Sequence, residues 1–246
     1  GTSDKSGVSQ VLNRLTYLSC ISHLRRVSAS ADITGKLIPP RKLHNSSWGF
    51  LCLAETPEGG SVGVVKNLAY LSHITIPSNS SALYELVEPY VIPIEMSREP
   101  EYYYNKVKVF VNGCWVGVVD DPIEFYKDIH EKKCKGIINI YTSIVLDLKV
   151  LEIRICNDGG RLTRPILRVK NNKALITSDI ISKLDKGELL WNDLLTECRL
   201  DESVIEYIDP EEQNYATIAM KTKDEFLQKC DVINYSHCEI HSSAIF

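Results

Sequence analysis

Hydrophobic residues near the start of the chain recur at three- and four-residue steps, which is the period of an α-helix. The side chains that keep this spacing are Val8, Val11, Leu12, Leu15, Leu18, Ile21 and Leu24. The pattern predicts one or two helices between Val8 and Arg26. Residues 35–63 differ, because they are rich in glycine and proline and have few periodic stretches. They predict a structured loop that needs a scaffold around it.

The clearest strand pattern lies in residues 107–119. Valines alternate with other residues from 107 to 111, the dipeptide Asn112-Gly113 is typical of a tight hairpin turn, and residues 115–119 are again mostly apolar. A β-hairpin is therefore predicted.

Helix and strand signals continue after the hairpin. Asp121 is expected to cap a helix that has Pro122 in its first turn and Gly136 at its end. Residues 144–156 alternate like a strand, but the apolar side chains change face near Val150. Such a change predicts a bulge or bend there.

The rest of the chain mixes both kinds of element without internal repeats. We expect strands near residues 166–169 and 215–220 and short helices near residues 179–184 and 191–198. The predicted fold class is α+β. A polar break at residues 78–81 sets the domain division, with a helical and loop module over 1–77, a mixed α+β domain with the β-hairpin over 78–232, and the start of another domain over 233–246.

Composition narrows the class of protein. With 44% hydrophobic residues the chain can form real cores, and it has neither an apolar run of membrane-spanning length nor an opening signal segment. It begins at Gly1 without methionine and stops at Phe246 without a polar tail, as expected of a piece of a longer protein. The eight cysteines form no C-x2-C pair, which argues against a zinc ribbon and favours buried thiols in a reducing compartment.

Charge is distributed unevenly along the chain. Residues 1–73 carry eight Lys/Arg against four Asp/Glu, whereas residues 74–246 carry twenty against twenty-eight, within a net charge of −4. A polyanionic partner is therefore expected to meet the first third of the chain.

Eight short motifs follow one another in an order that chance is very unlikely to produce. They are Gly7–Arg14 with Ser22–Arg26; Gly35–Leu37 with Pro40–Asn45; Trp48-Gly49 with Glu55–Gly59; Val65–Leu68; Val109–Gly113 with Trp115; Asp158 with Gly160-Arg161 and Arg164-Pro165; Glu206–Asp209 with Glu211-Glu212; and His237–His241. Together they resemble the central part of the second-largest subunit of multisubunit DNA-directed RNA polymerases, in the form found in eukaryotes, archaea and large DNA viruses.

This resemblance implies a place and a role. It identifies residues 1–77 with the fork module, residues 78–232 with the outer domain often called external 2, and residues 233–246 with the start of the hybrid-binding domain. It implies a non-catalytic part of a nucleotidyltransferase that positions template DNA and the RNA–DNA hybrid, with the largest and other polymerase subunits as partners. The complete enzyme would use Mg²⁺, and this part of it would bind none. The enzyme would act in the nucleus, or in the cytoplasm if the chain comes from an archaeon or a cytoplasmic DNA virus.

Candidate nucleic-acid contacts cluster in the first predicted helix. Arg25 and Arg26 are expected at its end, where guanidinium groups could reach phosphates, although paired arginines are often a solvated helix end. Gln10 and Asn13 match family positions that face the hybrid, and their amides suit sugar and backbone contacts, with a capping or surface role as the alternative. His23 is either a phosphate partner or a histidine at the edge of the core.

The glycine- and proline-rich loop adds a second group. Lys36, Arg41 and Lys42 have a spacing without aromatic residues that favours electrostatic contact with a nucleic-acid backbone, with a solvated loop as the alternative. Glu55, Glu58 and Gly59 are interpreted as loop-organising residues, the carboxylates pairing with arginines such as Arg25 or Arg26.

Two acidic or histidine-containing motifs could suggest metal chemistry. Asp120-Asp121 is interpreted as a helix cap, and His237, Glu239 and His241 as structural residues, because a His-x3-His pair without a second ligand cluster is a weak zinc signal. We therefore predict neither a catalytic residue nor a metal ligand. Two alternatives stay open at this point. One is a free-standing nucleic-acid-binding module outside any polymerase, and the other is a metal hydrolase built on His237, Glu239 and His241.

Overall fold

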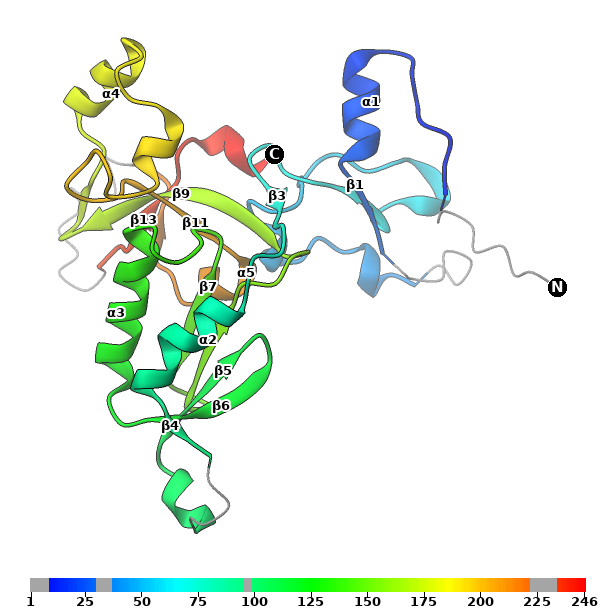
Figure 1. Cartoon of the computed structure of the whole chain (residues 1–246). Coiled ribbons are helices and arrows are strands. Elements are labelled where there is room, and N and C mark those ends of the chain that lie inside the picture. The colour runs from blue at the N-terminus through cyan, green and yellow to red at the C-terminus, as the bar shows by residue number, and fades with distance from the viewer. Residues whose placement is uncertain (1–8, 30–36, 95–98, 222–233) are drawn as a thin grey trace. The chain divides into compact units, whose positions relative to one another are not determined.

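The computed structural model describes residues 9–29, 37–94, 99–221 and 234–246 (Figure 1). The chain divides into two compact units, unit 1 with residues 1–73 and 243–246 and unit 2 with residues 74–242. Helices and sheets occur together, which confirms the α+β class. The assignment of residues 1–77, 78–232 and 233–246 to three domains stays a prediction. In the described ranges no helix combines the length and apolar character needed to cross a bilayer.

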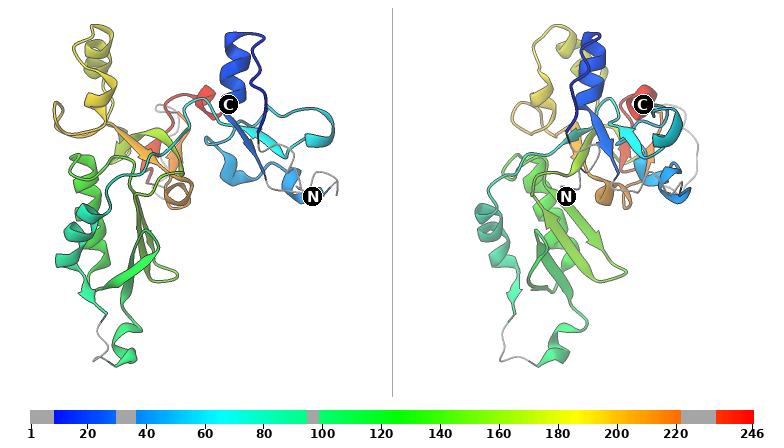
Figure 2. Two further views of the ribbon diagram at one scale, coloured as in Figure 1. Left: turned by 45° about the vertical axis from the view of Figure 1, so that its right-hand side comes forward. Right: turned by 90° about the vertical axis from the view of Figure 1, so that its right-hand side faces the viewer.

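Unit 1 is built around one short helix and a two-stranded ribbon. Helix α1 (Tyr17–Leu24) leads into β1 (Arg26–Ser28), which pairs antiparallel with β2 (Val65–Asn67). Figure 2 shows α1 extending away from this ribbon. Unit 1 also contains three short 3₁₀ turns, η1 (Pro39–Arg41), η2 (Asn45–Ser47) and η3 (Gly59–Ser61), and its chain reaches the boundary at β3 (His73–Ile74).

The first helix is shorter than the sequence predicted. Thr16 caps α1, because its Oγ1 accepts a hydrogen bond from the Ser19 backbone N–H at 3.1 Å while Ser19 Oγ accepts from the Thr16 N–H at 2.9 Å. Before the cap, Asn13 Oδ1 accepts from the Leu15 N–H at 3.1 Å and holds a non-helical turn. Gln10 and Asn13 therefore precede the helix, which corrects their predicted place on it.

The loop between β1 and β2 folds over a small apolar centre. Phe50, Val64 and Ala69 are almost completely buried in it. Gly63 has a φ of +71°, and a Cβ placed there would lie 2.4 Å from the carbonyl oxygen of Arg41. Only glycine fits this close approach of two backbone segments.

Unit 2 contains a five-stranded sheet in the order β4-β6-β5-β8-β7. Strands β5 and β8 run parallel and the other neighbours antiparallel. The predicted hairpin is confirmed, since Asn112 and Gly113 have φ values of 49° and 81° as a type I′ turn requires. The strands are β4 (Ile92–Pro93), β5 (Val107–Val111), β6 (Cys114–Val119), β7 (Ser143–Asp147) and β8 (Glu152–Cys156).

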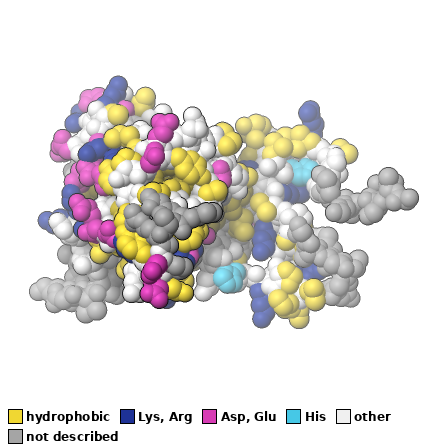
Figure 3. All heavy atoms as spheres, turned by 60° about the horizontal axis from the view of Figure 1, so that its bottom comes forward, with side chains coloured by type: hydrophobic (Ala, Val, Ile, Leu, Met, Phe, Trp, Pro, Cys, Tyr) yellow, Lys and Arg dark blue, Asp and Glu magenta, His cyan; other side chains and the backbone are white. Residues whose placement is uncertain are grey.

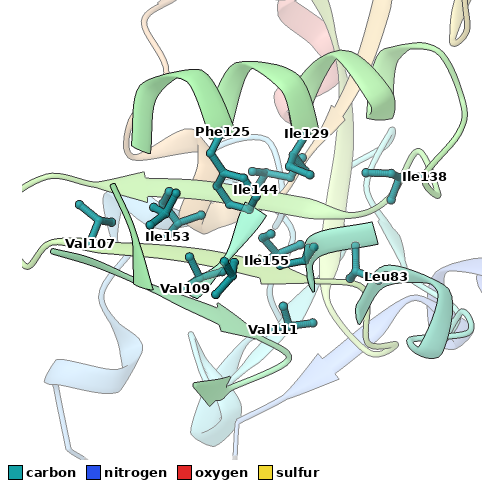
Figure 4. Packing of buried hydrophobic residues seen from close by; sticks show 13 residues of the cluster. Leu83, Val107, Val109, Val111, Phe125, Ile129, Ile138, Ile144, Ile153 and Ile155 are labelled. Carbon is teal, nitrogen blue, oxygen red and sulfur yellow. The ribbon is translucent and has the colours of Figure 1, made fainter. Parts of the chain in front are cut away.

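Two helices cover apolar side chains of this sheet, α2 (Ser81–Val87) and α3 (Pro122–Cys134). Figure 4 shows Phe125 and Ile129 of α3 directed towards Ile144 of β7. Asp121 caps α3 as predicted, its Oδ1 accepting from two backbone N–H groups, those of residues 123 and 124, at 3.2 and 3.1 Å.

A second sheet is centred on the long strand β9 (Leu162–Lys170). Strands β10 (Lys173–Ala174), β11 (Ile205–Ile208) and β13 (His237–Cys238) all pair with β9, and β12 (Ile218–Ala219) runs parallel to β13. A separate core lies here, with Leu167, Leu194 and Ile205 among its buried members. The remaining elements are η4 (Glu88–Tyr90), η5 (Pro100–Tyr103), α4 (Ser178–Asp185), η6 (Trp191–Leu194), α5 (Pro210–Gln213) and η7 (Ser242–Ile245).

Three predicted elements of unit 2 are corrected by the structure. Residues 144–156 form the antiparallel pair β7 and β8 instead of one bent strand, because the chain turns back at residues 148–151, where Asp147 Oδ1 accepts from the Lys149 N–H at 2.9 Å. The helix expected at 191–198 is only the 3₁₀ turn η6, and the strand expected at 215–220 is only β12.

The cysteines described by the structure are free thiols. Cys134 and Cys238 are buried as the composition suggested, but Cys114 and Cys198 are exposed. Cys230 lies outside the described residues.

Candidate nucleic-acid interface

Three of the predicted contact residues meet at one pocket of unit 1. The pocket has a volume of about 360 Å³, and Gln10, His23 and Arg26 contribute to its lining. The other lining residues are Ser28, Pro57, Glu58, Ser61 and Val65. Of these other lining residues, Glu58 was predicted from the sequence as a loop-organising residue. The Glu55–Gly59 motif was the signal that marked this loop.

His23 fixes the segment that precedes its own helix. Its Nδ1 accepts a hydrogen bond from the Asn13 backbone N–H at 3.0 Å, and its Nε2 lies 2.8 Å from Gln10 Oε1. Because Nδ1 is an acceptor, the ring proton is on Nε2 and is donated to the Gln10 carbonyl oxygen. The Gln10 amide NH₂ is then left to donate to another group, and the Gln10 side chain is exposed.

The two adjacent arginines occupy different environments. Arg26 is exposed at the start of β1 and lines the pocket. Arg25 Nη2 donates to the carbonyl oxygens of Ala69 at 2.7 Å and Ser72 at 3.0 Å, with Tyr70 further away at 3.4 Å. The guanidinium of Arg25 thus ties the helix end to the segment after β2, and its direct contact with nucleic acid stays a prediction.

Glu55 and Glu58 do not form the predicted ion pairs with these arginines among the contacts of the described residues. The Glu55 carboxylate accepts from Ser22 Oγ at 2.8 Å, and its backbone carbonyl accepts from Asn67 Nδ2 at 3.2 Å, so Glu55 connects α1 and β2 through hydrogen bonds. Gly59 follows with a φ of +88°, a conformation that favours glycine. Among the described residues, Glu55 contributes hydrogen bonds and Gly59 a backbone conformation that favours glycine, and the loop-organising role of Glu55, Glu58 and Gly59 stays a prediction.

The residues of the second predicted basic group, Lys36, Arg41 and Lys42, also differ from one another. Arg41 holds the loop together, its Nη1 donating to the carbonyl oxygens of Gly60 at 2.7 Å and Val62 at 2.8 Å. Lys42 is exposed beside it. Lys36 lies outside the described residues.

Unit 2 contains a buried network of charges that sequence reasoning did not find. Lys133 is 2% exposed, and its Nζ lies 3.1 Å from Glu206 Oε1 and 3.0 Å from Glu212 Oε1. His130 Nε2 lies 3.0 Å from Glu206 Oε1, and His237 Nε2 lies 3.3 Å from Glu206 Oε2. The motif that contains Glu206 and Glu212 was the only, weak signal of this network, because the partners are far apart along the chain.

Within the motif His237–His241, Cys238 and Glu239 are buried, whereas His241 is exposed. Glu239 is 3% exposed and forms a bidentate ion pair with Arg164, whose Nη1 and Nη2 lie 2.7 and 2.8 Å from the two carboxylate oxygens. No group of three His, Cys, Asp or Glu side chains able to hold a metal ion occurs among the described residues. The geometry gives no support to a metal hydrolase.

Acidic side chains are distributed over unit 2. Figure 3 shows Asp and Glu side chains among hydrophobic ones on the face of unit 2 turned towards the viewer. This agrees with the excess of acidic residues over residues 74–246 and leaves unit 1 as the basic part of the chain.

Comparison with known proteins matches both units to domains of the same polymerase subunit. Residues 10–74 match the family model described as RNA polymerase Rpb2, domain 3, and residues 109–170 match RNA polymerase Rpb2, domain 4. Over 98% of the chain, it is 41% identical to DNA-directed RNA polymerase II subunit RPB2 of Encephalitozoon cuniculi and 40% identical to DNA-directed RNA polymerase II subunit 2 of Arabidopsis thaliana. It is also 32% identical, over its whole length, to DNA-directed RNA polymerase subunit 2 of Acanthamoeba polyphaga mimivirus.

The chain covers 21% of the first two relatives and 22% of the viral one, so it spans about a fifth of the length of the curated relatives it matches. The two family models match consecutive parts of the chain, one in each unit. The chain therefore belongs to the family of the second-largest subunits of DNA-directed RNA polymerases.

Proposed function

We propose that the chain works as part of the second-largest subunit of a DNA-directed RNA polymerase, where unit 1 positions the template DNA and the RNA–DNA hybrid near the active centre during transcription. The relatives named above are all DNA-directed RNA polymerase subunits, which supports this proposal. The complete enzyme is a nucleotidyltransferase, and this chain contributes positioning and electrostatics to it.

The observation that carries the proposal is the pocket formed by Gln10, His23 and Arg26. An exposed guanidinium and an exposed amide beside it suit the phosphate and sugar oxygens of a nucleic acid, which are the same for every base sequence. His23 holds Gln10 with its NH₂ group unengaged by the ring, which prepares this donor for a ligand. A contact of this kind is what a polymerase needs, because it must move along any sequence.

Arg25 and Arg41 act in this proposal as positioning residues. Their guanidinium groups brace the ends of α1 and of the glycine-rich loop through backbone carbonyls. Asn13 acts likewise through its backbone N–H to His23. Lys42, which is exposed, and Lys36 would add long-range attraction for a polyanion.

The chemistry of nucleotide addition is assigned to other parts of the enzyme. The complete polymerase uses Mg²⁺, which stabilises the attacking and leaving oxygens. The described residues offer no set of three side chains that fits such an ion. No step of the reaction is therefore assigned to this chain.

Partners and location follow from the polymerase assignment. The largest subunit and other polymerase subunits, template DNA and nascent RNA would be the partners. The protein would act in the nucleus of a eukaryote, or in the cytoplasm if it comes from an archaeon or a cytoplasmic virus. Within the subunit we assign residues 1–77 to the fork module, 78–232 to the outer domain and 233–246 to the start of the hybrid-binding domain.

Replacement of Arg26 by alanine in the complete polymerase tests the proposal. Losing one phosphate contact is expected to make elongation complexes dissociate at lower salt and to reduce the slope of log affinity against log salt by about 1. Complex lifetime is measured across a salt series, with Arg26→Lys expected to keep part of the effect. Arg199→Ala, an equally charged change at an exposed position of unit 2, is the matched control. Wild-type salt tolerance in Arg26→Ala would contradict the proposal.

A further inference from the structure

Helix α1 presents its apolar side chains to the outside. Leu18 is 77% exposed, Tyr17 81% and Leu24 68%, and Ile21 lies between them on the helix surface. At about 100° per residue these four side chains fall within an arc of about 120°, so they form one stripe. Val11 and Leu15, in the segment before the helix, are also exposed and enlarge the apolar surface.

The polar side of the same helix faces its own chain. His23 accepts from the Asn13 backbone N–H, Ser19 Oγ lies 3.2 Å from Asn13 Oδ1, and Ser22 donates to Glu55. No residue of α1 is buried. A surface helix of a globular protein usually has the opposite arrangement, with its apolar stripe against the core and its polar side in water.

A helix of eight residues does not gain enough from its own hydrogen bonds to be stable in water. Its stability comes from packing of an apolar face, and among the described residues that face of α1 is covered only partly at Ile21, which is 37% exposed, and little at Tyr17, Leu18 and Leu24. The stripe defined by Tyr17, Leu18, Ile21 and Leu24 therefore has the character of half of a protein core.

We propose that this stripe docks onto an apolar segment of the same second-largest subunit, outside the 246 residues of this chain. The inference rests on the proposed function only for the identity of the complete subunit. The relatives are single polypeptides of which the chain spans about a fifth, so most of the polypeptide that could cover the stripe lies elsewhere in the subunit. The stripe contains no charged residue. Such a surface suits permanent burial within one polypeptide better than an interface that is exposed to water until a separate subunit binds.

Protection from solvent tests the occupant directly. Hydroxyl-radical oxidation of Tyr17, Leu18 and Leu24 is measured by mass spectrometry in the 246-residue chain, in the complete subunit alone, and in the complete subunit with the largest subunit added. Oxidation is expected to fall about tenfold in the complete subunit alone. Protection that appears only with the largest subunit, or that appears in the short chain as its concentration rises, would overturn the proposal in favour of another subunit or a second copy.

A pair of variants tests the same contact by stability. Leu18→Ser is expected to lower the unfolding temperature of the complete subunit by several degrees and to leave that of the 246-residue chain unchanged, because Leu18 is 77% exposed among the described residues of the chain. Ile76→Ser, at an aliphatic side chain 80% exposed in unit 2, is the matched control. An equal loss in both variants, or no loss in Leu18→Ser, would overturn the proposal. Neither readout involves nucleic acid, so failure here is distinguishable from failure of the proposed function.

Discussion

The carboxylate of Glu206 is contacted by side chains from α3 and from the second sheet. Lys133 and His130 approach its carboxylate from α3, and His237 approaches from β13. The charges of Lys133 and His130 hold the pKa of Glu206 well below its usual value although the side chain is buried, and the Glu206 charge in turn raises the pKa of His130 to about 10. The folded protein thus keeps His130 protonated at neutral pH.

Glu212 contacts the same ammonium group with a different result. Burial raises the pKa of Glu212 to about 7, and the nearby charges of Glu206 and Asp209 act in the same direction. Lys133, which also contacts Glu206, lowers the pKa of Glu212 but does not outweigh them. Hydrogen bonds from the backbone N–H groups of Ile144 and Asp209 only partly offset this. The pKa values of these two buried carboxylates are therefore shifted in opposite directions.

The raised pKa of His130 predicts how stability depends on pH. Below pH 6.5 the ring is protonated in both the folded and the unfolded chain, whereas between pH 6.5 and about 10 only the folded chain keeps the proton. The free energy of unfolding should therefore fall as pH rises through this window, by about 1–3 kcal/mol up to pH 9. Glu212 acts in the same direction between pH 4.5 and about 7. Urea denaturation at a series of pH values measures the slope.

Replacement of His130 by glutamine isolates this effect. His130→Gln should flatten the dependence of unfolding free energy on pH between 6.5 and 9. His44→Gln, at an exposed histidine that contacts Ser46, is the control and should keep the slope. An unchanged slope in His130→Gln would show that other groups produce it.

The candidate site was only partly predictable from its residues. Gln10, His23 and Arg26 were each singled out, but their meeting at one pocket depends on a hydrogen bond between residues ten apart in a segment that the periodicity assigned to a helix. The bracing role of Arg25 could not be predicted, because the carbonyl oxygens it reaches are 44 to 47 residues away in sequence.

At the scale of elements, local signals succeeded where a single motif decides the geometry. The Asn112-Gly113 turn and the Asp121 cap fix their elements within a few residues, so both were predicted correctly. Residues 144–156 were misjudged because a change of apolar phase is common to a bulge and to a reversal of the chain, and pairing of β7 with β8 distinguishes them. The predicted first helix was too long because Val11, Leu12 and Leu15 keep the apolar spacing of a helix although α1 begins only at Tyr17.

The Asp121 cap leads to a prediction for α3. Asp121→Ala removes the acceptor of two backbone N–H groups at the start of a helix whose Phe125 and Ile129 lie in the main core of unit 2. The free energy of unfolding should fall by about 1 kcal/mol, within the range measured for such caps. Urea denaturation followed by circular dichroism measures this loss.

Asp120 provides the comparison for the cap. Its side chain is 68% exposed and pairs with Lys106 at 2.8 Å, so Asp120→Ala should change stability little. Equal losses in the two variants would mean that negative charge at this end of α3, and not the capping geometry, is what stabilises the helix.

At the scale of the whole molecule, the chain combines a basic part with an acidic one. Residues 1–73 have an excess of four basic residues, but the net charge of the chain is −4. Within unit 1, Arg25 and Arg41 use guanidinium nitrogens on backbone carbonyls, while Arg26 and Lys42 are exposed. We therefore expect a polyanion such as nucleic acid to be attracted by this small basic surface and repelled by the rest of the chain.

The isolated chain is therefore expected to bind nucleic acid feebly. With two or three phosphates neutralised, the slope of log affinity against log salt should be roughly −2 to −3, and the dissociation constant should lie above about 10 μM at physiological salt. Gel-shift titration of an RNA–DNA hybrid at several salt concentrations measures both quantities. Strong affinity of the complete polymerase would then have to come from other parts of the enzyme. Submicromolar binding with a steep salt slope would instead mean that the chain is sufficient by itself, as a free-standing nucleic-acid-binding module would be.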